Sequence, residues 1–212
     1  MSTAQEAAYS KIRHAILTGV FRPGVQLRQE ELAEEFKMSR TAVRFAIQAL
    51  ADDGIVEISD TRRSFVADIT ETHAEETFDI LVMLEPYSAA LATLRASDDD
   101  IKALRKLIDE MEQVIEDDVA FLDLNSKFHR KIHSLSGNRS LRELIERIVD
   151  FPTTLYLKLG QSTESMGAHD DHRRILAAIE KRDTELVAME MKAHVEYRRR
   201  EFRDQWVEYH EG

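Results

Sequence analysis

The chain has 212 residues, of which 43% are hydrophobic, so it is long enough for one or two packed domains and too apolar to be disordered. It has no cysteine, which excludes disulfides, thiolate metal sites and cysteine nucleophiles, and its seven glycines and three prolines predict a mostly helical fold. The net charge of −11 argues against nucleic-acid binding by the whole surface, but residues 1–70 are nearly neutral, with nine lysines and arginines against ten acids.

Residues 1–70 predict a small domain in which helices precede strands. Apolar residues recur at helical spacing from the start of the chain, Gly19 ends that helix, and Ser39 is a suitable N-cap for a later one. The expected order is helices to about residue 19, over 29–36 and over 40–52, then strands over 55–58 and 64–67. Three helices followed by a hairpin make a winged helix-turn-helix.

This arrangement suits DNA, because an α-helix fits the major groove and its N-terminal residues reach base edges. The start of the third helix carries Arg40 and Arg44, which are four residues apart and share one face. The hairpin loop is placed to reach the minor groove or its phosphates. The residues expected to contact DNA are Arg28, Ser39, Arg40, Thr41, Arg44, Arg62 and Arg63. The alternative is that these arginines are simply solvated.

Residues 71–212 are expected to form a second, all-helical domain. The apolar pattern predicts helices over about 72–95, 97–117, 119–135, 138–152, 163–180 and 183–205. Pro152 is expected to kink or break the fourth of these helices. Arg198, Arg199 and Arg200 cannot all face one way on the last helix, so they are expected at the surface or in dimer contacts.

Histidines on three of these helices could meet inside the bundle. Asn125 and His129 project from one face of a helix, while His172 and His194 lie on later helices. Imidazole suits zinc, nickel, copper or iron, and an oxygen ligand adds tolerance of manganese. Spacing does not single these residues out, because two other pairs, His129 with His133 and His169 with His172, also have helical spacing. The alternative is that each is an ordinary buried or exposed histidine.

The stretch from Ile12 to Val66 resembles the DNA-binding domain of the GntR family of bacterial transcription regulators. The residues that carry the resemblance are Ile12-Arg13, Ile16-Leu17, Gly19, Pro23-Gly24, Leu27, Leu32-Ala33, Ser39-Arg40-Thr41, Val43-Arg44, Ala49-Leu50, Gly54 and Phe65-Val66. The resemblance implies a dimer that reads a short palindrome through Arg40, Thr41, Arg44 and Arg62. Three positions depart from the family pattern, with Ala42 for Pro, Phe45 for Glu and Arg63 for Gly. Phe45 is expected to pack against a neighbouring element.

Residues from about 72 to 205 resemble the FCD ligand-binding domain of FadR-type regulators, in the shorter subgroup with six helices. The matching segments are Leu84-Glu85, Ala89-Ala90, Leu91-Ala92, Phe128-His129-Arg130, Ser136-Gly137-Asn138, His172-Arg173, Ile175-Leu176, Ala178-Ile179, Asp183 and His194. The resemblance implies a divalent metal, most readily zinc, nickel or manganese, held by Asn125, His129, His172 and His194. Asn125 replaces the commoner Asp and brings no charge, so a weaker site is expected.

A second departure concerns the effector. Leu81 stands where family members often carry an arginine that clamps a carboxylate, which leaves Arg130 and Arg147 as candidate effector contacts. His133 does not match the ligand pattern, although it lies one turn from His129.

The resulting hypothesis is a ligand-responsive regulator and not an enzyme: a homodimeric repressor that binds operator DNA and senses a small organic acid at a metal-containing pocket. One alternative is the same regulator without a functional metal, as an apo sensor or with a structural histidine cluster. A remote alternative is a metal-dependent hydrolase with Asp170, Asp171 or Glu85 as general base. No apolar run approaches the roughly 18 residues of a membrane span, and residues 1–9 lack a signal pattern, so a cytoplasmic protein without membrane contact is expected.

Overall fold

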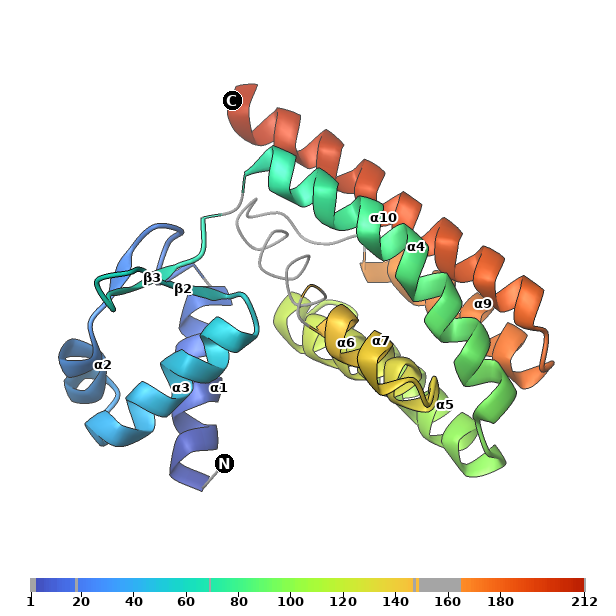
Figure 1. Cartoon of the computed structure of the whole chain (residues 1–212), viewed down its shortest axis with the longest axis horizontal. Helices are drawn as coiled ribbons and strands as arrows, with labels where there is room; N and C mark the ends of the chain where they lie inside the picture. The colour runs from blue at the N-terminus through green and yellow to red at the C-terminus, as the bar shows by residue number, and fades with distance from the viewer. Residues whose placement is uncertain (1–2, 18, 69, 147, 149–164, 212) are drawn as a thin grey trace. The chain divides into compact units, whose positions relative to one another are not determined.

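The computed structural model describes residues 3–17, 19–68, 70–146, 148 and 165–211 (Figure 1). These residues form two compact units, one extending to Thr70 and one beginning at Glu71. The fold is mostly helical with one small sheet, which confirms the predicted fold class. The predicted break at Pro152 and the candidate effector residue Arg147 lie outside the described residues.

The first unit is a winged helix-turn-helix. Its elements are α1 (Thr3–Leu17), β1 (Gln26–Leu27), α2 (Gln29–Glu35), α3 (Arg40–Asp52), β2 (Val56–Ile58) and β3 (Ser64–Val66). The helices pack around fully buried apolar side chains such as Ile12, Val43 and Leu50. The sheet is antiparallel in the order β1-β3-β2, so it contains one strand that the sequence pattern did not predict. With two residues, β1 is too short to show an alternating pattern, and only its pairing with β3 defines it.

The second unit is a helical bundle. Its described helices are α4 (Glu71–Arg95), α5 (Asp98–Gln113), α6 (Asp118–Leu135), α7 (Arg139–Glu146), α9 (Ser165–Glu180) and α10 (Thr184–Glu211). Ser97 begins α5 with a capping box, because its hydroxyl accepts from the Asp100 amide while the Asp100 carboxylate accepts from the Ser97 amide. The core lies between α4, α5, α6, α9 and α10, around buried residues such as Leu104, Phe128 and Ile175.

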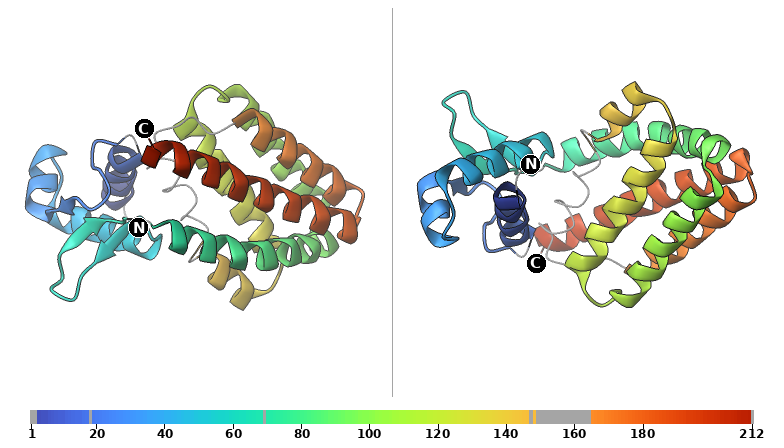
Figure 2. Two further views of the ribbon diagram at one scale, coloured as in Figure 1. Left: turned by 90° about the horizontal axis from the view of Figure 1, so that it is seen from above. Right: turned by 90° about the horizontal axis from the view of Figure 1, so that it is seen from below.

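Helices α4 and α10 lie side by side along their lengths (Figure 2). Glu75 on α4 accepts hydrogen bonds from Arg199 and Arg203 on α10, and the ring centroids of Phe78 and Phe202 are 5.9 Å apart. Because residue numbers on α10 fall as those on α4 rise, the two helices run antiparallel.

This pairing corrects the expectation for the three consecutive arginines of α10. Arg198 is buried, and Arg199 forms ion pairs with Glu75 and Asp79 on α4. Only Arg200 is exposed, as a surface arginine would be. The reason is that this part of α10 packs against α4. Successive residues point about 100° apart, so Arg198 and Arg199 face protein while Arg200 faces solvent.

Helix α4 is long and apolar enough to cross a membrane by length and composition alone. Within the bundle, however, 44% of its apolar stretch is buried, and Glu85 and Ser88 on its inner face are buried as well. These features are those of a core helix in a folded bundle.

Candidate functional site

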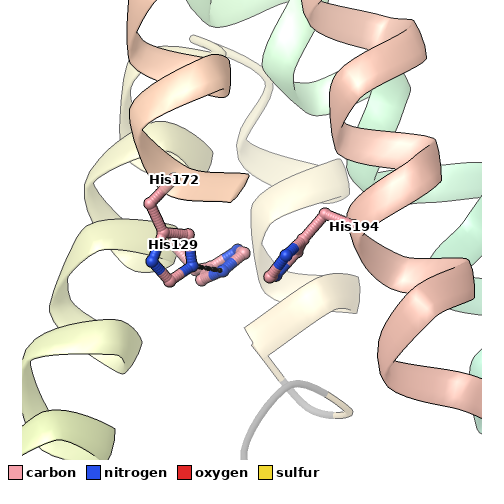
Figure 3. Close-up of side chains that lie close together, drawn as sticks. All are labelled: His129, His172 and His194. Carbon is pink, nitrogen blue, oxygen red and sulfur yellow. Dashed lines mark hydrogen bonds between the residues drawn. The ribbon is translucent and has the colours of Figure 1, made fainter. Parts of the chain in front are cut away.

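Three histidines from three helices converge inside the bundle (Figure 3). His129 on α6, His172 on α9 and His194 on α10 are all buried. The Nε2 atoms of His129 and His172 are 3.3 Å apart, and the His194 ring centroid lies 5.2 Å from that of His129 and 4.9 Å from that of His172. Three of the four predicted metal ligands therefore lie together. The fourth, Asn125, is half-buried on α6 one turn before His129.

Aromatic packing holds His172 in this position. Its ring centroid is 4.9 Å from that of Phe128 and 6.5 Å from that of Phe121, and both phenylalanines come from α6. Because His172 is fully buried, its imidazole exchanges no hydrogen bonds with bulk water. The apolar stripe that closes the bundle therefore also fixes the orientation of this candidate ligand.

Two buried carboxylates lie behind the histidines. Glu85 on α4 places Oε2 2.8 Å from Nε2 of His133 and 3.6 Å from Nδ1 of His129. Asp171 on α9 places Oδ2 3.0 Å from Nδ1 of His194. The sequence suggested these two acids only as candidate bases of a hydrolase, and their contacts with the histidines were not predicted. The available signal was one glutamate inside the apolar run of α4 and one aspartate beside His172.

Burial favours the neutral form of two of the three histidines, and contacts with histidines keep the two acids ionised. Burial lowers the pKa of His172 well below its usual value and lowers the pKa of His194 to about 4, although the Asp171 hydrogen bond opposes the second shift. For Glu85, burial favours the neutral acid, but charge and hydrogen bonds from His133 and His129 together hold its pKa below the usual range. For Asp171, burial acts in the same direction and is outweighed mainly by the hydrogen bond with His194, so the pKa is again lowered. Neutral imidazole is the form that binds a metal.

The arrangement fits a divalent cation. Two imidazole nitrogens each about 2.1 Å from one ion lie a little over 3 Å apart at the usual ligand angles, and the Nε2 atoms of His129 and His172 are 3.3 Å apart. Among the described residues, the buried Nδ1 atoms of His129 and His172 have no hydrogen-bond partner. A second group, made of Glu85, His129 and His133, also has its ligand atoms within 4.8 Å of one another. Three imidazoles would leave coordination positions open to a small molecule.

The lowered pKa of His194 predicts acid-sensitive stability. In the unfolded chain this imidazole takes up a proton near its ordinary pKa of 6.5, whereas in the folded protein it stays neutral down to about pH 4. The unfolded state therefore binds more protons in this range, so the free energy of unfolding falls as the pH falls. We expect a loss of about 3 kcal/mol from His194 between pH 6.5 and 4 in metal-free protein. Urea denaturation as a function of pH measures it, and a His194→Asn profile as steep as that of the wild type would contradict the assignment.

The predicted DNA contacts lie on the exposed face of the winged unit. Ser39 is the N-cap of α3, its hydroxyl accepting from the amide of Ala42 at 3.2 Å, and Arg40, Thr41 and Arg44 are exposed on the first turns of that helix. Arg28, Arg62 and Arg63 are also exposed. Within the unit, Arg40 pairs with Glu30 and Arg28 with Glu31, both at 2.8 Å. Exposed pairs of this kind contribute at most about 1 kcal/mol, so phosphate can displace the glutamates.

One expectation about this face needs correction. Phe45 does not pack against a neighbouring element: it is 48% exposed, and the Arg44 guanidinium lies 5.9 Å from its ring centroid. The reason is its direction, because α3 buries Val43, Ala46 and Ile47, and Phe45 points away from that face. In the wing turn, the residue in the left-handed region is Arg62, with φ 59°, so glycine would relieve strain there and not at Arg63.

An Arg62→Gly substitution is therefore expected to separate stability from DNA binding. Glycine relieves about 1 kcal/mol of left-handed strain, and its greater freedom in the unfolded chain offsets roughly 0.5–1 kcal/mol of that gain. We expect the free energy of unfolding to stay within about 1 kcal/mol of the wild type, while removal of one charged side chain weakens DNA binding by roughly tenfold. Urea denaturation and fluorescence anisotropy measure the two quantities. Unchanged DNA affinity would remove Arg62 from the interface.

The candidate effector residues are placed differently from one another. Arg130 is exposed on α6, whereas its neighbour His129 is buried. Arg198 was not a candidate, yet its side chain is buried one helical turn beyond His194. Leu81, which stands where an arginine often occurs in the family, is buried on α4.

Known proteins resemble this chain over both units. The family model described as bacterial regulatory proteins, gntR family, matches residues 4–66, and the FCD domain model matches residues 76–197. The uncharacterized HTH-type transcriptional regulator YdhC of Bacillus subtilis is 27% identical over 192 residues, which are 88% of this chain and 85% of YdhC. The HTH-type transcriptional repressor GlaR of Escherichia coli is 25% identical over 88% of this chain and 90% of its own length.

Solved structures share the fold. The structure of E. coli McbR/YncC superposes with a TM-score of 0.79 at 21% identity and covers 97% of this chain and 100% of that one. The metal-free FCD domain of TM0439 superposes with a TM-score of 0.53 at 19% identity, over 66% of this chain and 99% of that domain.

Proposed function

We propose, starting from the fact that this chain belongs to the gntR family of bacterial regulatory proteins and carries an FCD domain, that it is a cytoplasmic repressor that binds palindromic operator DNA as a homodimer. We further propose that a divalent metal in the bundle takes part in sensing a small organic acid. The observation that carries this proposal is the convergence of three buried histidines on one point.

The winged unit supports DNA binding through its exposed arginines. Arg40 and Arg44 lie one turn apart at the start of α3, where a helix in the major groove presents side chains to base edges. Arg62 and Arg63 extend the positive surface onto the wing. Because the whole chain carries a charge of −11, attraction to DNA has to come from this local set of side chains.

An apolar stripe on α4 supports the homodimer. Ile80, Met83, Tyr87 and Leu94 are 44%, 74%, 54% and 69% exposed. Their spacing places all four on one side of the helix. Burying this stripe against the same stripe of a second copy would give a twofold interface, and a twofold protein reads a palindrome.

The bundle supports a metal-assisted effector site. His129, His172 and His194 would hold zinc, nickel or manganese, with the amide oxygen of Asn125 as a fourth ligand, and the bound ion would accept a carboxylate of the effector at an open position. The buried guanidinium of Arg198, one turn beyond His194, pairs with the Glu201 carboxylate at 2.8 Å, and an anionic effector would have to take the place of that carboxylate to bind it. Effector binding would shift the population of dimer conformations and so change the affinity for the operator.

The alternative without a functional metal rests on the hydrogen bond between the Nε2 atoms of His129 and His172, which could serve a purely structural cluster. The hydrolase alternative finds less support. Asp171 already bonds to His194 and Arg174, Glu85 bonds to His133, and Asp170 is exposed.

Selection from randomised double-stranded DNA tests the regulator. Purified protein is expected to enrich an inverted repeat, and transcription in vitro from a promoter overlapping that repeat is expected to fall when the protein is added. The Arg40→Ala/Arg44→Ala variant serves as the control and is expected to enrich nothing. Enrichment of a single half-site would contradict the dimer, and increased transcription would contradict the repressor.

A further inference from the structure

Glu85 is a carboxylate enclosed in the bundle, and its position is unusual for a charged group. It lies on the inner face of α4, is 4% exposed, and bonds through Oε2 to a fully buried histidine, His133, at 2.8 Å. An ionised carboxylate is expensive to bury unless it is paired and hydrogen-bonded. The contacts of Glu85 with the neighbouring histidines therefore indicate its role.

The contacts determine which nitrogen of His129 carries the proton. Nδ1 of His129 lies 3.6 Å from Oε2 of Glu85, whereas Nε2 lies 3.3 Å from Nε2 of His172. A proton on Nδ1 faces a negative charge, and a proton on Nε2 faces another imidazole. Glu85 therefore favours the Nδ1–H tautomer, which leaves the Nε2 lone pair directed at the centre of the cluster.

Asp171 has the corresponding relation to His194. Its Oδ2 lies 3.0 Å from Nδ1 of His194, so the proton again sits on Nδ1 and Nε2 is left free to accept. Two of the three converging imidazoles thus have a carboxylate from a different helix near Nδ1. His172 has no such partner among the described residues, and its ring is held by Phe121 and Phe128.

His133 forms the hydrogen bond that holds the Glu85 carboxylate in place. It lies one turn beyond His129 on α6, and its Nε2 is used by the 2.8 Å hydrogen bond to Glu85. A nitrogen engaged in this way is not available to an ion at the three-histidine centre. His133 therefore positions Glu85, and Glu85 in turn lies beside Nδ1 of His129.

We propose that Glu85, held by His133, is a positioning residue that fixes the Nδ1–H tautomer of His129 and supplies charge to the metal centre. Asn125 brings no charge to this centre, so the Glu85 carboxylate, 3.6 Å from Nδ1 of His129, is placed to supply negative charge beside a divalent ion, together with Asp171, which also pairs with Arg174. Carboxylates behind ligating histidines orient the ring and strengthen its basicity. The role in metal binding rests on the proposed function, whereas the tautomer is a property of the metal-free protein.

The first test is the tautomer of His129 in metal-free wild-type protein at pH 8, read from long-range ¹H–¹⁵N correlation spectra. We expect His129 and His194 both as the Nδ1–H form. In Glu85→Gln we expect His129 to become a mixture of tautomers while His194 keeps its form. An Nε2–H form of His129 in the wild type would overturn the proposal, and this measurement needs no variant that folds.

The second test is Ni²⁺ affinity, measured by competition with a chromophoric chelator. Glu85→Gln is expected to bind Ni²⁺ about ten to one hundred times more weakly than the wild type, and Glu85→Asp, which keeps the charge, is expected to recover part of the loss. The matched control is Glu75→Gln on the same helix, whose partners are Arg199 and Arg203, and its affinity is expected to be unchanged.

The outcomes of the two tests are distinct. Equal affinity in Glu85→Gln and the wild type would overturn the charge role. Two Ni²⁺ ions per wild-type chain, with only one in Glu85→Gln, would make Glu85 a metal ligand and overturn the positioning role. No Ni²⁺ binding by a wild type that shows the Nδ1–H form would overturn the proposed metal centre and support the orientation of His129 by Glu85.

Discussion

Replacing His172 by alanine is expected to lower the affinity for Zn²⁺ or Ni²⁺ by at least about a hundredfold, the largest effect of any single change in the bundle. His172 is the most enclosed of the three converging histidines, and its Nε2 lies 3.3 Å from that of His129. Removing one of three imidazoles leaves a site with two, which holds a divalent ion far less tightly. Metal content by mass spectrometry on untagged protein, and chelator competition, measure the loss.

The same substitution separates binding from folding. Metal present at about a thousand times the wild-type Kd stabilises the wild type by about 4 kcal/mol, whereas a hundredfold weaker site is stabilised by only about 1.4 kcal/mol, so added metal is expected to raise the Tm of the wild type much more than that of His172→Ala. Alanine also leaves a cavity beside Phe121 and Phe128, so the metal-free variant is expected to lose roughly 2–4 kcal/mol of stability. Circular dichroism establishes that it is folded at the temperature of the titration.

His73→Ala is the matched control for that experiment. Its side chain is 63% exposed on the first turns of α4, so both metal affinity and Tm are expected to match the wild type. A His172→Ala protein that kept its metal would show that the ion, if bound, lies elsewhere. Metal absent from the wild type itself, even after incubation with zinc, nickel and manganese, would favour the regulator with a purely structural histidine cluster.

The second large effect is expected in the winged unit. Arg40→Ala/Arg44→Ala is expected to weaken binding to the selected operator by about a hundredfold or more, because two cationic side chains at the start of α3 each contribute about 1–3 kcal/mol to binding. Where these side chains bind phosphates, the slope of log affinity against log salt is expected to fall by roughly one for each arginine removed. Fluorescence anisotropy at several salt concentrations gives both quantities.

Stability is expected to change little in this variant. Both arginines are exposed, and the pair between Arg40 and Glu30 is an exposed one worth at most about 1 kcal/mol. The charge-matched control is Lys102→Ala/Lys106→Ala on α5, where both lysines are exposed and pair with acids of the same helix. Equal reductions in affinity in the two double variants would mean that only net charge matters, and the assignment of α3 as the reading helix would then be wrong.

Local patterns determined most of the secondary structure of this protein. The period of the apolar residues predicted α3 as residues 40–52 and α6 as ending at residue 135, and the structure has the same bounds. These features depend on residues close together in the chain, so a sequence pattern contains them. The strand β1 was not predicted because it exists only through pairing with β3, almost forty residues later.

Side-chain environments were harder to predict than elements. The direction of Phe45 depends on which face of α3 the other helices cover, and burial of Arg198 depends on the contact between α10 and α4. Charge alone suggested a surface position for Arg198, and hydrophobicity alone suggested burial of Phe45. In both cases the packing of distant segments was decisive, and hydropathy of one residue carries no information about it.

The candidate metal centre divides in the same way. The sequence by itself, through a family resemblance, determined that His129, His172 and His194 are the residues to consider, while spacing left His133 and His169 equally eligible. The resemblance set His133 aside, but only the tertiary structure gives the physical reason, because it places Glu85 2.8 Å from His133 across 48 positions of sequence and leaves His129, His172 and His194 facing one another. Helical periodicity tells which side of its own helix a residue faces. Which residue of another helix it meets there depends on the depth and register of packing, and that is decided by the whole bundle.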